Sequence, residues 1–237
     1  MKLELLCLTL FFLPLLGNEI KGGPIVSAED FPFIARLGIK KGRWVYTCTG
    51  SLVKDDLILT AKHCFHKNGK TYYHGSATFF DTFRGYKDRK EFSVKMKLIK
   101  TYPKSDLALA RLTRKVSNIT PLRIYNKKLS PGTTVKATGY GMHDFRQNDG
   151  HLRHIDLRVA YDRGNYVGTK IGKNNEGPCG GDSGGPLLVQ TGNSYSVAGT
   201  LYGAGYDCRT GIVSRAFPDD KWSSVRVIKS GDIPRLG

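Results

Sequence analysis

One run, residues 178–186, constrains this chain more than any other stretch, because Pro-Cys-Gly-Gly-Asp-Ser-Gly-Gly-Pro sets a single serine among four glycines. Glycines on both sides of a serine leave the surrounding backbone N–H groups open, as a serine that meets a substrate carbonyl requires. The same composition is also common in plain turns. Taken alone, the run therefore fits either a turn or a nucleophile at Ser183, and the nucleophile requires partners elsewhere in the chain.

A serine hydroxyl needs a histidine base, and the histidine needs a carboxylate that orients it. His63 follows the apolar run 57–59, which is typical of a buried strand, and Asp106 stands at the start of the apolar run 107–110. Together with Ser183 these residues occur in the order His, Asp, Ser. On these three motifs the sequence resembles the chymotrypsin-like (trypsin-type) serine proteases over most of its length.

The resemblance implies a serine endopeptidase that works through an acyl-enzyme. Ser183 would attack the scissile carbonyl, His63 would take its proton and later give it to the leaving amine, and Asp106 would hold the imidazole in the working tautomer. The backbone N–H groups of Gly181 and Ser183 would form the oxyanion hole. No cofactor or metal is expected, because metal-ligand spacing is lacking among the other histidines, His66, His74, His143, His151 and His154.

The rest of the sequence consists of short apolar or alternating segments between turn residues, which predicts an all-β chain. Strands are predicted at 33–38, 44–49, 51–59, 92–99 and 107–112, and then at 134–139, 152–160, 186–190, 194–202 and 211–215. Turn chemistry marks 67–70 and 81–85, and only the tail, 218–230, reads as a helix. The resemblance implies two antiparallel six-stranded Greek-key barrels with a C-terminal helix, and an active site in the cleft between the barrels.

The N-terminal segment predicts secretion. Lys2 precedes an apolar segment, 5–16, that is too short to span a bilayer and suits a signal peptide, and no other stretch could cross a membrane. We expect a signal peptide and short activation segment over 1–19, and a peptidase domain over 20–237. Its first barrel would cover 20–120 and its second 121–237, with the crossing near 116–125. The protein would be extracellular, with storage in secretory granules as one possibility.

The sequence from Ile20, Ile-Lys-Gly-Gly, resembles the mature N-terminus of the family. Cleavage before Ile20 would free an α-ammonium that inserts beside Asp182 and orders the oxyanion loop. Glu19 before that bond argues against trypsin as the activating protease. The alternative is that residues 20–23 are only a linker after the signal peptide.

Five cysteines are present, and Cys7 lies inside the signal segment. The other four allow three pairings, and all are eligible for disulfides in a secreted chain. The resemblance selects Cys48 with Cys64, beside His63, and Cys179 with Cys208, beside Ser183.

The substrate pocket is less well defined by the sequence. The family position at which an aspartate captures Lys or Arg is Gly177 here, which argues against tryptic specificity. Gly203 and Gly211 would leave an open pocket for an apolar side chain, so a chymotrypsin-like or elastase-like preference is expected. Leu201-Tyr202-Gly203 stands where the family usually has Ser-Trp-Gly, although counting from Ser183 without gaps places Tyr202 at the serine position.

The formal net charge is +17, which predicts attraction to polyanions such as heparin-like glycans. The alternative is a solvated basic surface without a dedicated partner, because the cations are scattered along the chain. Expected partners are protein or peptide substrates and protein protease inhibitors, with no specific nucleic acid, and the chain is expected to be a monomer. Asn118 stands in a glycosylation sequon.

A function of another class is a cationic, catalytically silent polyanion-binding or antimicrobial protein on a protease scaffold. Such relatives usually lack a triad residue, whereas this chain keeps His63, Asp106 and Ser183.

Overall fold

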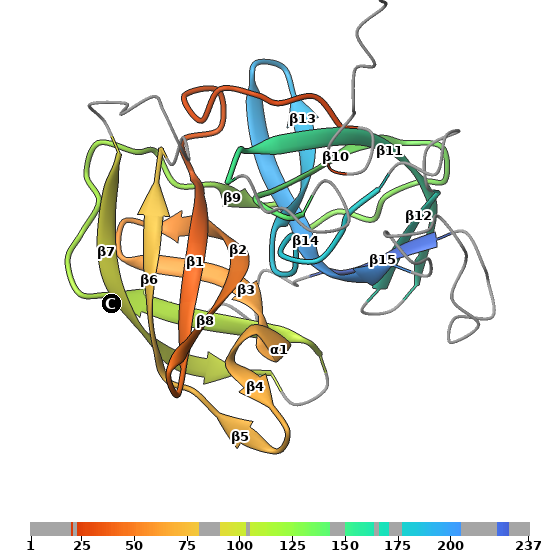
Figure 1. The fold of residues 1–237 in the computed structure, drawn as a ribbon. Helices are drawn as coiled ribbons and strands as arrows, with labels where there is room; N and C mark the ends of the chain where they lie inside the picture. The colour runs from red at the N-terminus through yellow and green to blue at the C-terminus, as the bar shows by residue number, and fades with distance from the viewer. Residues whose placement is uncertain are drawn as a thin grey trace, which may run out of the picture.

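The computed structural model describes residues 20, 23–80, 91–102, 105–142, 150–163, 166–170, 177–204 and 222–227, and two barrel-like β units account for nearly all of them (Figure 1). The all-β prediction is therefore confirmed. The one helix among these described residues is the single turn α1 (Lys62–Phe65). The same residues contain no helix that is long and apolar enough to span a membrane.

The first unit is a closed antiparallel barrel in the order β1-β2-β3-β8-β7-β6. Its strands are β1 (Ile34–Lys41), β2 (Trp44–Lys54), β3 (Leu57–Ala61), β6 (His74–Phe79), β7 (Phe92–Thr101) and β8 (Leu107–Leu112). All five residues of β3 are buried, whereas β7 alternates buried and exposed side chains. The barrel therefore closes around an apolar core, and every second side chain of β7 faces the solvent over most of that strand.

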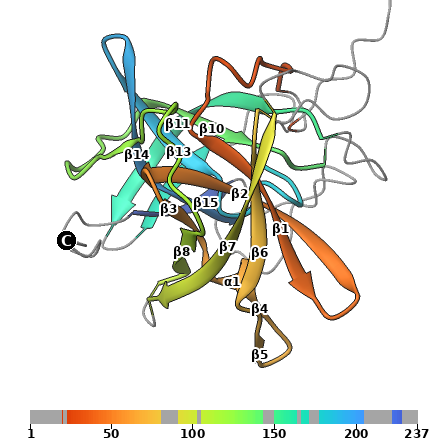
Figure 2. The ribbon, with the colours of Figure 1, turned by 90° about the vertical axis from the view of Figure 1, so that its left-hand side faces the viewer.

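A small hairpin projects from the end of the first barrel. Its strands, β4 (His66–Lys67) and β5 (Lys70–Thr71), lie beyond α1 in both views (Figures 1 and 2). The predicted turn at 67–70 is confirmed, because Asn68 and Gly69 have φ angles of 50° and 73°, as a two-residue Asn-Gly hairpin turn requires.

The second unit is a sheet with the strand order β13-β10-β11-β12-β15-β14-β9. Because β13 also pairs with β14, the sheet closes on itself, and only β9 lies outside the closed set of strands. The strands are β9 (Arg123–Ile124), β10 (Thr134–Gly139), β11 (Arg153–Arg163), β12 (Tyr166–Lys170), β13 (Pro186–Thr191), β14 (Ser194–Ala204) and β15 (Trp222–Val227). The strand β9 adds to β14 in parallel. A second apolar cluster fills this unit.

The chain passes between the two units over residues 116–125. Its N–H groups at Val116 and Leu122 donate to carbonyls of the first unit, Asp55 O at 2.7 Å and Leu52 O at 2.9 Å. Three residues after Leu122, Tyr125 N donates to a carbonyl of β14 at 2.9 Å. The crossing is therefore hydrogen-bonded to both units.

Two strand predictions need correction. The predicted break at Gly50 is wrong, because β2 runs through this residue and the turn comes at Asp55 and Asp56. A Cβ at Gly50 would lie 2.7 Å from Ile58 Cγ2 and 2.8 Å from Leu37 Cδ1, so this glycine is explained by close packing. The strands β6 and β12 were not predicted, and the predicted strand 211–215 and turn 81–85 lie outside the described residues.

The prediction of a C-terminal helix over 218–230 is wrong for residues 222–227, which form β15. This strand pairs antiparallel with β12 on one side and with β14 on the other. Backbone pairing on both edges outweighs a weak local helix pattern, and β-branched valines at 225 and 227 suit a strand.

Candidate active site

His63 and Asp106 are brought together by the pairing of β3 with β8. In that pairing Ala61 lies opposite Leu107, and just beyond it Lys62 N donates to Asp106 O at 2.9 Å. The strand β3 therefore delivers His63, in α1, to the same end of the barrel at which β8 begins with Asp106 beside it. Residues 43 apart in sequence become neighbours in this way.

The Asp106 carboxylate holds His63 at two points. Its Oδ1 accepts a hydrogen bond from the His63 backbone N at 2.9 Å, and its Oδ2 lies 2.5 Å from Nδ1 of the ring. A carboxylate can only accept at Nδ1, so the neutral ring carries its proton there and presents a lone pair at Nε2. The side chain of Asp106 is 10% exposed and that of His63 is 39% exposed, so the imidazole faces the solvent while the carboxylate that orients it is largely buried.

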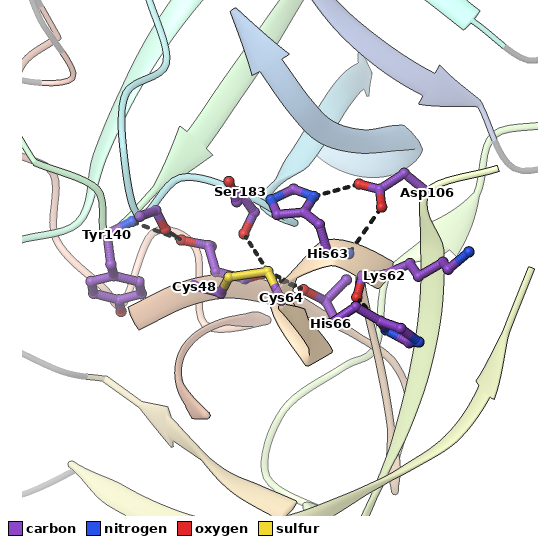
Figure 3. The surroundings of a disulfide bond; sticks show 11 residues. Cys48, Lys62, His63, Cys64, His66, Asp106, Tyr140 and Ser183 are labelled. Atoms are coloured by element: carbon purple, nitrogen blue, oxygen red, sulfur yellow. Dashed lines mark hydrogen bonds and ion pairs between the residues drawn. A yellow bond between two sulfur atoms is a disulfide. The ribbon is translucent and has the colours of Figure 1, made fainter. Parts of the chain in front are cut away.

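Ser183 lies on the other side of the imidazole. Figure 3 shows the His63 ring between Ser183 and Asp106. The serine comes from the loop that precedes β13, and it is half-buried. The three residues predicted as a triad thus lie together, two from the first unit and one from the second.

The loop that carries Ser183 is hydrogen-bonded to both units. On the first unit, Thr49 N donates to Ser183 O at 2.9 Å, and Thr49 Oγ1 donates to Gly181 O at 3.0 Å. On the second, Gly184 N donates to Leu201 O at 2.8 Å. The position of the serine is therefore set by the contact between the units.

The amides of this loop fall into two kinds. Asp182 N donates to Cys179 O at 3.1 Å, and Gly184 N is bonded to β14 as described. The N–H groups of Gly181 and Ser183 donate to no acceptor among the described residues. Gly181 has a φ angle of 98°, a conformation that side-chain-bearing residues rarely adopt. Two backbone N–H groups near the Ser183 hydroxyl are thus available to an external acceptor, and the left-handed backbone of Gly181 makes that arrangement possible.

Asp182, in contrast to its neighbours, points into the protein and is fully buried. Its carboxylate accepts hydrogen bonds from Cys179 N and Gly141 N, each at 2.8 Å. Burial raises the pKa of Asp182 to about 6, and the two N–H groups together with the positive charge of Arg153 oppose that rise. The side chain of Ile20, its predicted partner in activation, is 1% exposed and packs in the apolar cluster of the second unit.

One predicted disulfide is confirmed. Cys48 and Cys64 are bonded with their Cα atoms 6.3 Å apart, which joins β2 to α1 directly beside His63. The Cys64 Sγ also lies 3.6 Å from Ser183 O (Figure 3), a contact only, since a disulfide sulfur has no proton to donate. Cys179 is disulfide-bonded as well, while Cys208, its predicted partner, lies outside the described residues.

The predicted pocket residues are only partly described. Gly177 is buried, and Tyr202 is half-buried with its ring 6.0 Å from the His63 ring. The side chain of Leu201 is 2% exposed and belongs to the apolar cluster of the second unit. Gly203 lies in β14, and Gly211 lies outside the described residues. Of the Leu201-Tyr202 pair, the tyrosine is therefore the residue that faces the candidate base.

A family model described as Trypsin matches residues 20–217. The chain belongs to the trypsin family. Human cathepsin G is 30% identical over 204 residues, which cover 78% of this chain and 80% of the relative. Granzyme B(G,H) of Mus musculus is 27% identical over 92% of this chain and 93% of the relative. The snake venom serine protease ussurase of Gloydius ussuriensis is 27% identical over 89% and 96%. With this membership of the trypsin family, the chain is a serine endopeptidase.

Among the residues that the structure describes, no three His, Cys, Asp or Glu side chains are grouped so that they could hold a metal ion. Three residues around the site were not predicted from the sequence: Thr49, Thr60 and Arg153. Thr60 Oγ1 donates to Thr49 O at 2.8 Å, beneath the serine loop. The two threonines adjoin motif residues, Thr49 next to Cys48 and Thr60 three before His63, and that adjacency was the available signal.

Proposed function

We propose that this trypsin-family protein hydrolyses peptide bonds through an acyl-enzyme formed on Ser183. The observation that carries the proposal is the double hold of Asp106 on His63, at 2.9 and 2.5 Å, with Ser183 on the opposite side of the ring. With its proton fixed on Nδ1, His63 accepts the serine proton at Nε2 as the hydroxyl attacks the carbonyl carbon. His63 then protonates the leaving amine, and a water molecule attacks the acyl-enzyme by the same route in reverse.

The oxyanion of each tetrahedral intermediate is bound, in this proposal, by the N–H groups of Gly181 and Ser183. This assignment is supported by the hydrogen bonding of the loop. The N–H groups of Gly181 and Ser183 have no acceptor among the described residues, whereas those of Asp182 and Gly184 donate to backbone carbonyls. Donors that are fixed before the reaction stabilise developing charge without reorganising, and losing one such donor typically costs about 100-fold or more in rate.

Activation proceeds by cleavage before Ile20. The side chain of Ile20 is buried in the apolar cluster of the second unit. The freed ammonium then pairs with the buried carboxylate of Asp182.

The substrate preference is for apolar side chains. The pocket position at which a carboxylate would select Lys or Arg is Gly177, and Gly203 and Gly211 complete an uncharged pocket in the family pattern. Tyr202, 6.0 Å from the His63 ring, adds an aromatic wall beside the base. Such a lining favours a large apolar residue before the scissile bond. A peptide library in which cleavage after Lys or Arg dominates would contradict this preference.

The protein is secreted and acts as a monomer, with one peptidase domain over residues 20–237 after a signal and activation segment over 1–19. Within that domain the first barrel covers 20–120 and the second 121–237. Storage in secretory granules and inhibition by protein protease inhibitors are part of the same proposal, and residues 5–16 support the secretory route.

Polyanionic glycans are a further proposed partner. The side chain of Lys41 is 8% exposed, and its Nζ lies 4.8 Å from the centre of the Tyr46 ring. The Nζ of Lys67 lies 4.1 Å from the same ring and 2.5 Å from Tyr46 Oη. Burial lowers the pKa of Lys41, and the charge of Lys67 lowers it further. Within the described residues neither ammonium group has a carboxylate partner. A sulfate group bound between Lys41 and Lys67 would therefore relieve the repulsion between their two positive charges.

Salt elution from immobilised heparin tests this partner. The double variant Lys41→Gln/Lys67→Gln should elute at lower salt than Lys115→Gln/Lys136→Gln, which removes the same charge from lysines already paired with Asp55 and Asp156. Equal shifts in the two double variants would mean that the basic surface has no dedicated site.

Labelling by a fluorophosphonate probe tests the catalytic proposal and separates it from a silent cationic binding protein. We expect the chain that begins at Ile20 to be labelled at Ser183, and we expect Ser183→Ala and His63→Ala to abolish the label. Ser130→Ala, an exposed serine of the second unit, is a matched control that should label normally. A folded chain that begins at Ile20 and takes no label would support the silent protein.

A further inference from the structure

The hydroxyl of Thr49 links the two units beneath the candidate active site. Thr49 is a fully buried residue of β2 in the first unit. Its Oγ1 accepts a hydrogen bond at 3.0 Å from the backbone N of Tyr140, which follows β10 in the second unit. The same Oγ1 donates to Gly181 O at 3.0 Å. Because an N–H group can only donate and a carbonyl can only accept, the direction of the hydroxyl proton is fixed.

The acceptor of that proton lies in the loop whose N–H groups are proposed to bind the oxyanion. In a planar trans peptide the C=O group and the next N–H group point in opposite directions, so a bond that holds the carbonyl also sets the N–H group. The Gly181 N–H is set in this way, because Gly180 O accepts a hydrogen bond from Met142 N at 2.7 Å. The N–H of the serine is set likewise, because Asp182 O accepts from Gly185 N at 2.8 Å.

The peptide from Gly181 to Asp182 lies between these two planes, and the Thr49 hydroxyl holds its carbonyl. Two consecutive glycines, at 180 and 181, give this part of the loop more conformational freedom than any other residue pair would. The N–H of the same peptide donates to Cys179 O at 3.1 Å. Among the described residues, the Thr49 hydroxyl is the one side-chain donor to the carbonyls of residues 180–183, and the other donors are backbone N–H groups.

The hydroxyl of Thr49 is presented from a rigid position. The backbone of Thr49 is held on both sides, since Thr49 N donates to Ser183 O at 2.9 Å and Thr49 O accepts from Thr60 Oγ1 at 2.8 Å. A β-branched side chain has few rotamers, and the Cγ2 methyl lies 3.2 Å from a Cβ built on Gly185, so it packs against the loop. The hydroxyl therefore keeps one position relative to the serine loop.

We propose that Thr49 is a positioning residue, whose hydroxyl fixes the peptide from Gly181 to Asp182 so that the two proposed oxyanion donors keep one arrangement throughout the reaction. The proposal rests on the proposed catalytic function of Ser183. Donors that are fixed in advance act on the charge that develops in the transition state. Loss of the hydroxyl therefore lowers kcat and leaves substrate binding largely unchanged.

The experiment compares the wild type, Thr49→Val and Thr49→Ser in the chain that begins at Ile20. Thr49→Val keeps the shape of the side chain and removes the hydroxyl, whereas Thr49→Ser keeps the hydroxyl. Values of kcat and KM are measured with an active ester of an aromatic amino acid. Inhibition by a peptide aldehyde is measured as well, because addition of the Ser183 oxygen to the aldehyde carbon places the former carbonyl oxygen where the oxyanion forms.

Thr78→Val is the matched control. Thr78 lies in β6 of the same barrel and is 9% exposed, and its Oγ1 donates to Ser93 Oγ at 3.3 Å. This variant therefore removes a threonine hydroxyl and its hydrogen bond from the first unit without touching the serine loop. Urea unfolding of all variants shows whether a decrease in kcat merely follows a loss of stability.

Thr49→Val should lower kcat by at least about tenfold, which corresponds to about 1.4 kcal/mol. The decrease should stay below the roughly 100-fold or larger loss that follows removal of an oxyanion donor itself. KM should change by less than about threefold, and the inhibition constant of the aldehyde should rise by about the factor by which kcat falls. Thr49→Ser should keep kcat within about threefold of the wild type, and Thr78→Val should change neither constant.

A wild-type kcat in folded Thr49→Val, or an effect on KM alone, would overturn the inference while leaving the catalytic proposal intact. So would Thr49→Ser that is as slow as Thr49→Val, or an equal decrease of kcat in Thr78→Val. If the wild type hydrolyses no ester, the catalytic proposal is wrong and the role of Thr49 falls with it. Should Thr49→Val fail to fold, Thr49→Ala also lacks the hydroxyl, and the same outcomes decide.

Discussion

Gly184, the residue after the candidate nucleophile, lies where the serine loop meets the first barrel. Its φ angle is 81°, and a Cβ built on it would lie 2.0 Å from Thr60 Oγ1, 2.6 Å from Thr49 O and 2.7 Å from Ala61 N. Two of these three atoms belong to strand backbones and cannot rotate away. We therefore predict that Gly184→Ala separates the serine loop from the first barrel.

The expected loss of stability has three parts. A left-handed alanine costs about 1–2 kcal/mol. Overpacking against fixed neighbours typically costs about 1–3 kcal/mol. Displacing Thr60 breaks its 2.8 Å hydrogen bond to Thr49 O, and a buried hydroxyl left unpaired costs about 1–3 kcal/mol. The free energy of unfolding should therefore fall by roughly 3–6 kcal/mol, allowing for partial relaxation.

Urea unfolding measures this loss, and Gly192→Ala is the control. Gly192 has a φ angle of 59°, but a Cβ there meets no atom within 4 Å, so its substitution reports the backbone strain alone. Gly184→Ala should destabilise the protein by at least about 2 kcal/mol more than Gly192→Ala. It should also abolish labelling of Ser183, which Gly192→Ala should preserve. Equal losses of stability in the two variants would refute the contact between the serine loop and the first barrel.

Three further predictions concern the surroundings of the site. Replacing Cys48 and Cys64 together by alanine should lower the free energy of unfolding by about 3 kcal/mol, measured by urea titration under non-reducing conditions; an unchanged midpoint would contradict this. Asp106→Asn should reduce kcat by about ten-thousandfold while leaving the fold unchanged, because the amide stabilises the wrong tautomer of His63; a decrease below about tenfold would show that Asp106 does not orient the base. Burial lowers the pKa of His154 from 6.5 to about 4, so the neutral ring favours the folded state above pH 6.5, and this advantage is lost as the pH falls toward 4. His154→Gln should therefore flatten the decrease of Tm between these pH values, and an unchanged slope would contradict the assignment.

The catalytic motifs could be predicted from the sequence because each one carries a chemical requirement. A serine among glycines, a histidine after a buried strand and an aspartate before another define the candidates. The pairing of β3 with β8 then accounts for the meeting of His63 and Asp106. The disulfide between Cys48 and Cys64 also followed from the resemblance to the family.

Features that depend on strand register could not be predicted in this way. Arg153 is one arginine among many in the sequence, and only its pairing with Gly139 places it on the side of Asp182. Gly50 resembles a turn residue until the strands around it bring Leu37 and Ile58 against its Cα. The segment 222–227 becomes a strand because β12 and β14 offer it backbone partners on both sides.

The central claim, an acyl-enzyme on Ser183, is tested most directly by trapping that intermediate. The chain that begins at Ile20 would be mixed with an active ester of an aromatic amino acid, quenched in acid and mapped by peptide mass spectrometry. We expect one acyl group per molecule, on the peptide that contains Ser183, and none in Ser183→Ala or His63→Ala. Hydrolysis that persists in Ser183→Ala, or an acyl group on another residue, would contradict it.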